Sequence, residues 1–276
     1  MTVLHDLYRL PKAKRVRGGG SEESQRQSLR PTSAEARHAM EDRFAETVLL
    51  SDWVDFVFIH FEVDRDLLQQ VVPFPVDTYE GKAFVSLVAF TMKRMRPAFG
   101  GKATGWILRP IASHQFLNLR TYVNLGGQTG IFFMEEWLNE KFAVILGPKT
   151  FGLPYHYASV DYLHDEERCA CRVLANEGEI CFSGRKNKAL GTVCPGSRDD
   201  FLLERYTAFT AAGRKPHYFR VWHPSWKIGA VDHFELTSRV LLSGLRELWT
   251  DTAIVVGTHW SPGVFDVRMG RPHSVG

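Results

Sequence analysis

One segment of the sequence, residues 118–122 (NLRTY), carries polar side chains at alternate positions of an otherwise apolar stretch. Successive side chains of a strand point to opposite sides, so Asn118, Arg120 and Tyr122 would share one face. A guanidinium is planar and always charged, and with an amide and a phenol beside it this face suits a carboxylate or another anionic head group. If this face points into the protein, it would form the wall of a ligand-binding site. If it points outward, it is an ordinary solvated face.

A second candidate is the pair Tyr155 and His156, which follows the Gly/Pro-rich residues 147–154. An imidazole titrates near neutral pH, so His156 could act as a general base, with Tyr155 as the proton donor. A histidine between tyrosines is equally compatible with simple packing and hydrogen bonding. These two residues are the candidate catalytic groups, and a structural role is the alternative.

A third candidate is the triplet Glu204, Arg205 and Tyr206, which follows the apolar residues 201–203. Either charged residue could be an internal ion-pair partner or a ligand-binding group. Because a solvent-exposed ion pair contributes little to stability, the triplet has a function only if it is buried.

The spacing that metal and nucleotide sites require is missing from the sequence. The histidines are scattered without a helical i, i+4 pair, and Cys169 and Cys171 form a C-x-C pair where zinc ribbons use C-x-x-C. No G-x-G-x-x-G segment, Walker loop or G-x-S-x-G elbow is present. We expect neither a metal nor a cofactor.

The elements that must position these residues are mostly strands. Apolar or alternating runs rich in Val, Ile and Phe occupy residues 53–63, 82–95, 116–125, 130–138, 168–183, 217–231 and 253–270. Residues 64–73 and 236–249 have helical spacing, and residues 199–209 fit a helix or a helix-to-strand junction. Many strands with few short helices predict a mainly β (α+β) fold, a closed or nearly closed antiparallel barrel.

The first 45 residues are expected to form a basic tail outside the folded domain of residues 46–276. Residues 18–37 are polar and Gly/Ser-rich, which favours disorder, although a helical turn capped by Thr32 or Ser33 is expected from residue 33 to 43. The net charge is +3 and much of the excess lies in the tail, so we expect no nucleic-acid binding. No membrane span or signal peptide is apparent, which favours the cytoplasm.

Eight segments in order resemble the YqjF-like (DUF2071) family. They are FIHFEVDRDLLQQVVP, YEGKAFVSLVAFTM, NLRTYV, GIFFMEEW, GLPYHYA, DDFLLERYTAF, WHPSWKI and SPGVFDV, between about residues 50 and 268. That family is related to acetoacetate decarboxylase, so the resemblance implies a twisted antiparallel barrel around a closed internal pocket. This agrees with the strand pattern.

The resemblance also implies a loss of the decarboxylase chemistry. Acetoacetate decarboxylases carry a lysine pair in a G-x-P-K-K type segment, where this sequence has Tyr155 and His156 after Gly152-Leu153-Pro154. A Schiff base needs an amine with a lowered pKa, which tyrosine and histidine cannot supply. Lys149 would have to fold into the pocket with the loop at Gly147-Pro148 to replace it.

The leading hypothesis is therefore a barrel pocket that binds a small anionic or keto-acid-like molecule. Its ligand-binding residues would be Arg120, Asn118, Tyr122, Glu204, Arg205 and Tyr206. One alternative is a lyase or hydratase that uses His156 and Tyr155 as acid and base, and another is a non-catalytic structural or partner-binding protein. The exposed edges of a barrel also permit a homo-oligomer.

Overall fold

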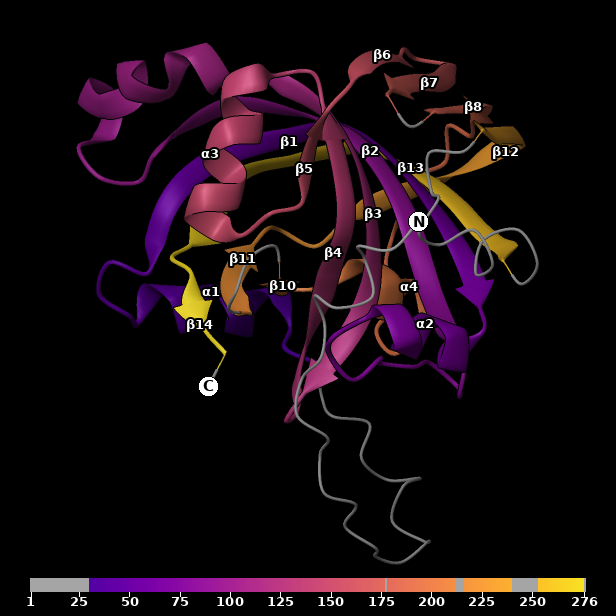
Figure 1. Cartoon of the computed structure of the whole chain (residues 1–276), viewed down its shortest axis with the longest axis horizontal. Helices are drawn as coiled ribbons and strands as arrows, with labels where there is room; N and C mark the ends of the chain where they lie inside the picture. Colours follow the sequence, from indigo (N-terminus) through magenta and orange to yellow (C-terminus); the bar gives the residue numbers. More distant parts are fainter. Residues whose placement is uncertain (1–29, 177, 212–215, 240–252, 276) are drawn as a thin grey trace, which may run out of the picture.

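The computed structural model describes residues 30–176, 178–211, 216–239 and 253–275. Five long strands rich in β-branched and aromatic residues form its curved wall (Figure 1). They are β1 (Thr47–Val63), β2 (Ala83–Pro97), β3 (His114–Leu125), β4 (Gln128–Leu138) and β13 (Ile254–Gly270). Strands β1 to β4 are antiparallel neighbours in chain order, and β13 pairs with the other edge of β1.

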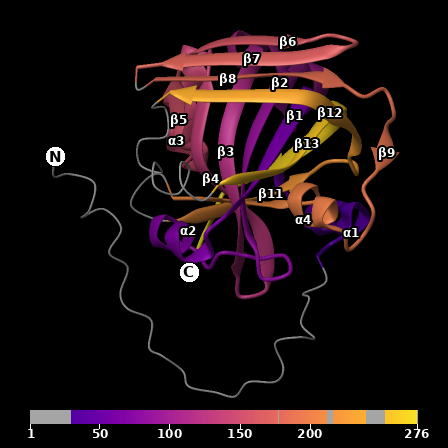
Figure 2. The ribbon, with the colours of Figure 1, turned by 90° about the vertical axis from the view of Figure 1, so that its right-hand side faces the viewer.

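Two short strands close this wall into a ring. Strand β10 (Thr207–Thr210) pairs with β4 in parallel, and β11 (His217–Trp222) pairs with both β10 and β13. The hydrogen-bonded neighbours therefore lead back to the first strand, and the mainly β, barrel-like fold expected from the sequence is confirmed (Figures 1 and 2). The parallel contact of β10 departs from a purely antiparallel barrel.

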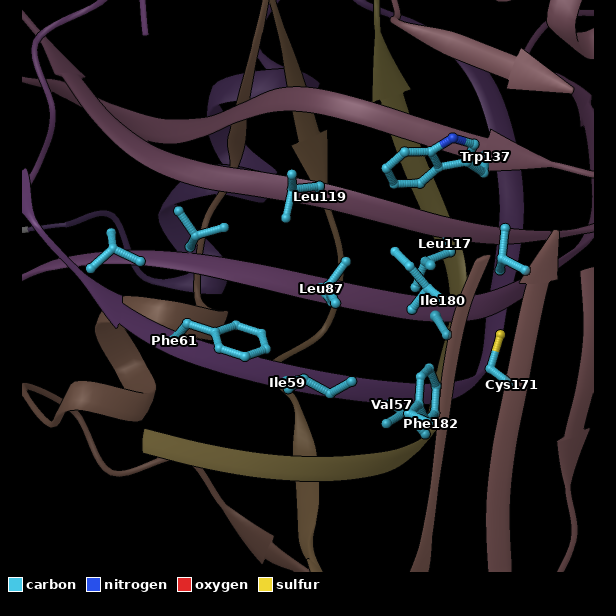
Figure 3. Packing of buried hydrophobic residues seen from close by; sticks show 14 of the residues in the cluster. Val57, Ile59, Phe61, Leu87, Leu117, Leu119, Trp137, Cys171, Ile180 and Phe182 are labelled. Atoms are coloured by element: carbon cyan, nitrogen blue, oxygen red, sulfur yellow. The ribbon is translucent and has the colours of Figure 1, made fainter. Parts of the chain in front are cut away.

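A second layer covers the outer face of β1 to β3. It consists of β6 (Ser159–His164), β7 (Arg168–Ala175), β8 (Gly178–Lys186) and β12 (Lys227–Arg239). Alternation along β1 decides which side chains meet it: Val57, Ile59 and Phe61 pack outward against residues such as Ile180 and Phe182 (Figure 3). The intervening residues of β1 face the inside of the ring. The wall of the site described below therefore has a hydrophobic core on its outer side.

The remaining elements are short. They are α1 (Ser33–Glu41), α2 (Arg65–Val71), α3 (Lys141–Phe151), α4 (Arg198–Leu203), the 3-10 helix η1 (Gly101–Ile111), β5 (Tyr155–Tyr157), β9 (Gly191–Thr192) and β14 (His273–Ser274). Helix α4 followed by β10 confirms the predicted helix-to-strand junction. Across the described ranges, no helix is long and apolar enough to cross a membrane.

Helix α3 corrects the loop expected at Gly147-Pro148. Both residues lie inside the helix, which ends at Gly152 in the left-handed conformation. Gly147 is required there because a Cβ at this position would lie 2.3 Å from the ring of Tyr155. The glycine therefore marks the close packing of α3 on β5, not a turn.

Helix α1 lies before residue 45, within the segment expected to form the tail, and is attached to the ring. Thr32 and Glu35 form a capping box, and hydrogen bonds fasten the helix to the ring, one from Arg268 to Glu41 at its last residue and two at its first residue. Ser33 Oγ donates to the carbonyl of His223 at 2.7 Å, and Trp222 Nε1 donates to the carbonyl of Ser33 at 2.9 Å. Residues 1–29 of the expected tail lie outside the described residues.

The helix expected at 236–249 is also corrected in part. Residues 236–239 belong to strand β12, where they pair with residues 179–182 of β8. Residues 240–252 lie outside the described residues.

Candidate functional site

A cavity lies inside the ring of strands. All seven ring strands contribute to its lining, and aromatic residues dominate it, among them Trp53, Phe56, Phe90, Phe116, Phe219 and Trp226. The centres of water-sized spheres can occupy about 60 Å³ of it. Since one such sphere fills roughly 15 Å³ and the centres alone range over more than this, the cavity holds more than one water-sized group.

Arg120 stands in this aromatic cavity. Regular pairing of β3 with β2 places it opposite Ser86, with its side chain inward. Its guanidinium lies 5.8 Å from the centroid of the Phe58 ring and hydrogen-bonds to Tyr122. Its Nε is buried without a hydrogen-bond partner, and no carboxylate of the described residues lies within ion-pair distance. Burial lowers the pKa of Arg120, although a guanidinium stays charged at neutral pH.

Asn118 and Glu136 face the cavity as cross-strand partners on β3 and β4. Asn118 Oδ1 and Glu136 Oε2 are both buried without a hydrogen-bond partner among the described residues. Burial raises the pKa of Glu136 well above its usual range; Arg120 opposes the rise and Glu135 adds to it. We therefore expect Glu136 to be protonated and neutral, a carboxylic acid that can donate a hydrogen bond.

Arg205 enters the cavity from the junction of α4 and β10. Its Nη1 donates to Asp77 Oδ2 at 2.8 Å and its Nε donates to the carbonyl of Phe201 at 2.6 Å. Its Nη2 is buried without a partner among the described residues. Because Asp77 already balances its charge, Arg205 offers the cavity a hydrogen-bond donor more than a free positive charge.

Glu204 and Tyr206, the neighbours of Arg205, are buried but do not line the cavity. Tyr206 donates to Glu204, whose other oxygen accepts from the backbone N–H of Trp226 at 2.9 Å. Together they fasten the segment that carries Trp226, a lining residue. Their place in the structure is that of supports for the wall.

Tyr155 and His156 lie on opposite sides of β5. Tyr155 lines the cavity beside Glu136, its partner on β4, and burial raises its pKa well above the usual range. His156 is 46% exposed, and its Nε2 lies 2.6 Å from Glu135 Oε2 on the outside. Lys149 is exposed on α3. The structure thus brings Tyr155, but not His156 or Lys149, to the cavity.

Tyr122, the third member of the predicted trio, lies just behind the cavity wall. It is fully buried, and its hydroxyl lies 2.6 Å from Ser86 Oγ. Its ring centroid is 5.2 Å from the guanidinium carbon of Arg205. Tyr122 therefore contacts both cavity arginines without lining the cavity itself.

Two titratable residues of the lining, Glu136 and His223, were not among the candidates from the sequence. His223 is buried beside Tyr206 and Trp226, and burial lowers its pKa. No group of three His, Cys, Asp or Glu side chains suited to a metal ion occurs among the residues that the structure describes. The lining likewise contains no lysine.

The sequence profile of DUF2071, described as an uncharacterized conserved protein, matches residues 51–264, which span every strand of the ring. The chain belongs to this family. The DUF2071 chain is also 30% identical over 192 residues to the "Uncharacterized protein YqjF" of Bacillus subtilis (strain 168), covering 65% of this chain and 74% of YqjF.

Solved structures share the fold of this DUF2071 chain at low sequence identity. Acetoacetate decarboxylase from Legionella pneumophila is 13% identical with a TM-score of 0.59, over 84% of this chain and 88% of its own. An acetoacetate decarboxylase-like enzyme from Sphingomonas wittichii RW1 is 14% identical with a TM-score of 0.60, over 83% and 94%. The enduracididine biosynthesis enzyme MppR, complexed with pyruvate, is 11% identical with a TM-score of 0.56, over 86% and 93%. These likenesses show the fold of the chain.

Proposed function

We propose that the cavity binds one small carboxylate, of the keto-acid or hydroxy-acid class, with Arg120 as its anchor. The observation that carries the proposal is an enclosed guanidinium without a carboxylate partner among the described residues. A buried charge is costly unless it is paired, so a cation retained in an aromatic cavity suits an anion that comes from outside. Glu136 does not fill this role, because it is not within ion-pair distance of Arg120 and because burial raises its pKa, which disfavours the charged form.

The unsatisfied polar atoms of the cavity define what the ligand must offer. Arg120 Nε and Arg205 Nη2 are donors, which a carboxylate oxygen can accept. Asn118 Oδ1 is an acceptor and calls for a hydroxyl or an N–H, whereas Glu136 can donate to a carbonyl. A carboxylate with an adjacent carbonyl or hydroxyl satisfies this set.

The size of the cavity supports a ligand of a few heavy atoms. The centres of water-sized spheres alone range over about 60 Å³, which is more than a single water needs. MppR, which shares the fold, was solved with pyruvate, a molecule of this size and class. Pyruvate is therefore the first probe to use.

We further propose that binding occurs without an imine. No lysine lines the cavity among the described residues, and Tyr155 lies there instead. A Schiff base needs a primary amine at the reacting carbon, which neither a phenol nor a carboxylic acid provides.

Native mass spectrometry with pyruvate tests both parts of the proposal. We expect one pyruvate per chain under native conditions, and its complete loss on denaturation even after borohydride treatment, because borohydride traps only an imine. A covalent adduct after borohydride, on Lys149 or any other lysine, would contradict the absence of imine chemistry. An absence of binding by pyruvate and by a panel of small keto and hydroxy acids would contradict the binding proposal.

A lyase or hydratase reaction is the second candidate, and one observation favours it. The neutral Glu136 lies in the cavity as the partner of Tyr155, which gives a carboxylic acid close to the place of a bound carbonyl. A carboxylic acid held neutral can act as a general acid in an enolising step. The acid would then be Glu136, since His156 lies outside the cavity.

A further inference from the structure

A row of hydrogen-bonded side chains begins at Arg120 and runs away from the cavity across three adjacent strands. The Arg120 guanidinium bonds to the hydroxyl of Tyr122 on β3. The Tyr122 hydroxyl lies 2.6 Å from Ser86 Oγ on β2, which lies 2.7 Å from His60 Nδ1 on β1. Tyr122, Ser86 and His60 are fully buried, so this row belongs to the interior and not to the solvated surface.

The donor and acceptor roles in the row follow from its first member. A guanidinium can only donate, so Arg120 favours the arrangement in which the Tyr122 oxygen accepts from Arg120 and the Tyr122 O–H points to Ser86. In this arrangement Ser86 donates to His60 Nδ1, and His60 carries its proton on Nε2. This nitrogen is buried without a partner among the described residues.

His259 on β13 provides the matching acceptor. Its ring centroid lies 5.5 Å from that of His60, and its Nδ1 is also buried without a partner in the described part of the chain. Its Nε2 lies 3.6 Å from Asp199 Oδ2, and the Asp199 side chain is 33% exposed. The two unpartnered nitrogens thus belong to neighbouring rings, and one bridging water or a small ring rotation would extend the row toward the surface.

The charges around the two histidines are mostly positive. Burial lowers the pKa of His60 well below its usual range, and His259, Arg120 and Arg198 lower it further. Burial also lowers the pKa of His259, where Asp199 opposes the shift and Arg198 adds to it. Arg120 is thus one of the charges that keep His60 deprotonated, and a ligand that neutralises Arg120 removes this part of the effect, while burial remains.

We propose that the His60–His259 pair is a proton-binding site linked to the cavity, which takes up a proton when a carboxylate occupies Arg120. The binding of a carboxylate at Arg120, on which this proposal depends, is the proposed function. By thermodynamic reciprocity, a site that gains a proton on binding also binds its ligand more tightly as the pH falls. Asp199 would stabilise the charged pair at its exposed end.

Calorimetric titration of pyruvate in buffers of different ionisation enthalpy measures the coupling. We expect an uptake of a fraction of a proton per pyruvate that grows as the pH is lowered, and a dissociation constant that falls by less than about tenfold per pH unit. The variants His259→Gln and His60→Gln should abolish most of this uptake. His259 is partly exposed, so its variant is expected to fold even if the fully buried His60 does not tolerate replacement. The exposed His233→Gln is the control and should behave like the wild type.

Uptake that persists undiminished in the folded His259→Gln variant would overturn the proposal, because His223 also faces the cavity directly and would then be the proton acceptor. A second measurement needs no ligand. In the Arg120→Met variant we expect NMR titration to give a raised pKa for the imidazole of His60, while the surface variant Arg172→Met leaves it unchanged. Unchanged values in Arg120→Met would overturn the coupling whether or not pyruvate binds.

Discussion

The Arg120→Met variant is expected to lose pyruvate binding by a factor of at least about 100. Truncating one member of a buried, hydrogen-bonded charge pair costs about 2–5 kcal/mol, and about 2.7 kcal/mol corresponds to a hundredfold change in dissociation constant. Methionine fills a similar volume among the aromatic side chains of the cavity. The measurement is calorimetric titration of wild type and variant at one pH and salt concentration.

The same variant should not unfold, and this separates a binding role from a structural one. Arg120 has no carboxylate partner among the described residues, so its removal relieves a buried charge and leaves thermal stability unchanged or raised. Arg172→Met, at a 61% exposed arginine paired with Glu179, is the matched control and should retain full affinity. Equal affinity in wild type and Arg120→Met would show that the guanidinium is not the anchor.

The largest expected effect on stability belongs to Asp77→Asn. The carboxylate accepts from Arg205 Nη1 at 2.8 Å, and the Arg205 side chain is only 2% exposed. Asparagine keeps the shape but removes the charge, which leaves a buried guanidinium without a counter-ion. Breaking a buried pair in this way costs roughly 3–5 kcal/mol, and we expect about 10 °C of lowering in the melting temperature.

Glu62→Gln provides the comparison for Asp77→Asn. Glu62 pairs with Lys82 at 2.8 Å, but the Lys82 side chain is 55% exposed. Exposed pairs of this kind contribute at most about 1 kcal/mol, so the variant should melt within a few degrees of the wild type. Similar losses in the two variants would mean that the Asp77–Arg205 pair is as well solvated as the surface pair.

The placement of Arg120 could be predicted because β3 is regular. Its pairing with β2 runs without a shift from His114 to Thr121, so strict alternation put Asn118 and Arg120 on one face. The sequence alone left open whether that face points inward. The direction depends on ring closure through β10 and β11, which join residues distant in sequence.

The inward direction of the Glu136 side chain could not be predicted, for a local reason. Alternation counted from Ile131 leads through Phe133 to Glu135, which would place Glu135 inward. The pairing of β3 with β4 shifts by one residue at this point, so that Arg120 faces Phe133 whereas Leu119 faces Glu135. This bulge turns Glu136 into the cavity and Glu135 out toward His156. No glycine or proline in β4 marks the irregularity between these residues.

For Tyr155 and His156, the alternation along a strand would have excluded the expected acid–base pair. Once Tyr155 and His156 lie in a strand, neighbours must point to opposite faces, so a single cavity cannot receive both. In the sequence, Gly147 and Pro148 suggested a loop that ends at Tyr155 and His156, whereas Gly147 and Pro148 lie in α3. The His60–His259 pair was beyond prediction for another reason, since it requires the pairing of β1 with β13 at the far end of the sequence.

The most direct test of the central claim is a crystal structure of the protein grown with pyruvate. We expect the carboxylate of pyruvate inside the ring of strands, within hydrogen-bond distance of Arg120, with no covalent bond between the keto carbon and any side chain. Pyruvate bound only outside the ring, with Arg120 free of it, would contradict the claim, and so would a bond from the keto carbon to a lysine nitrogen.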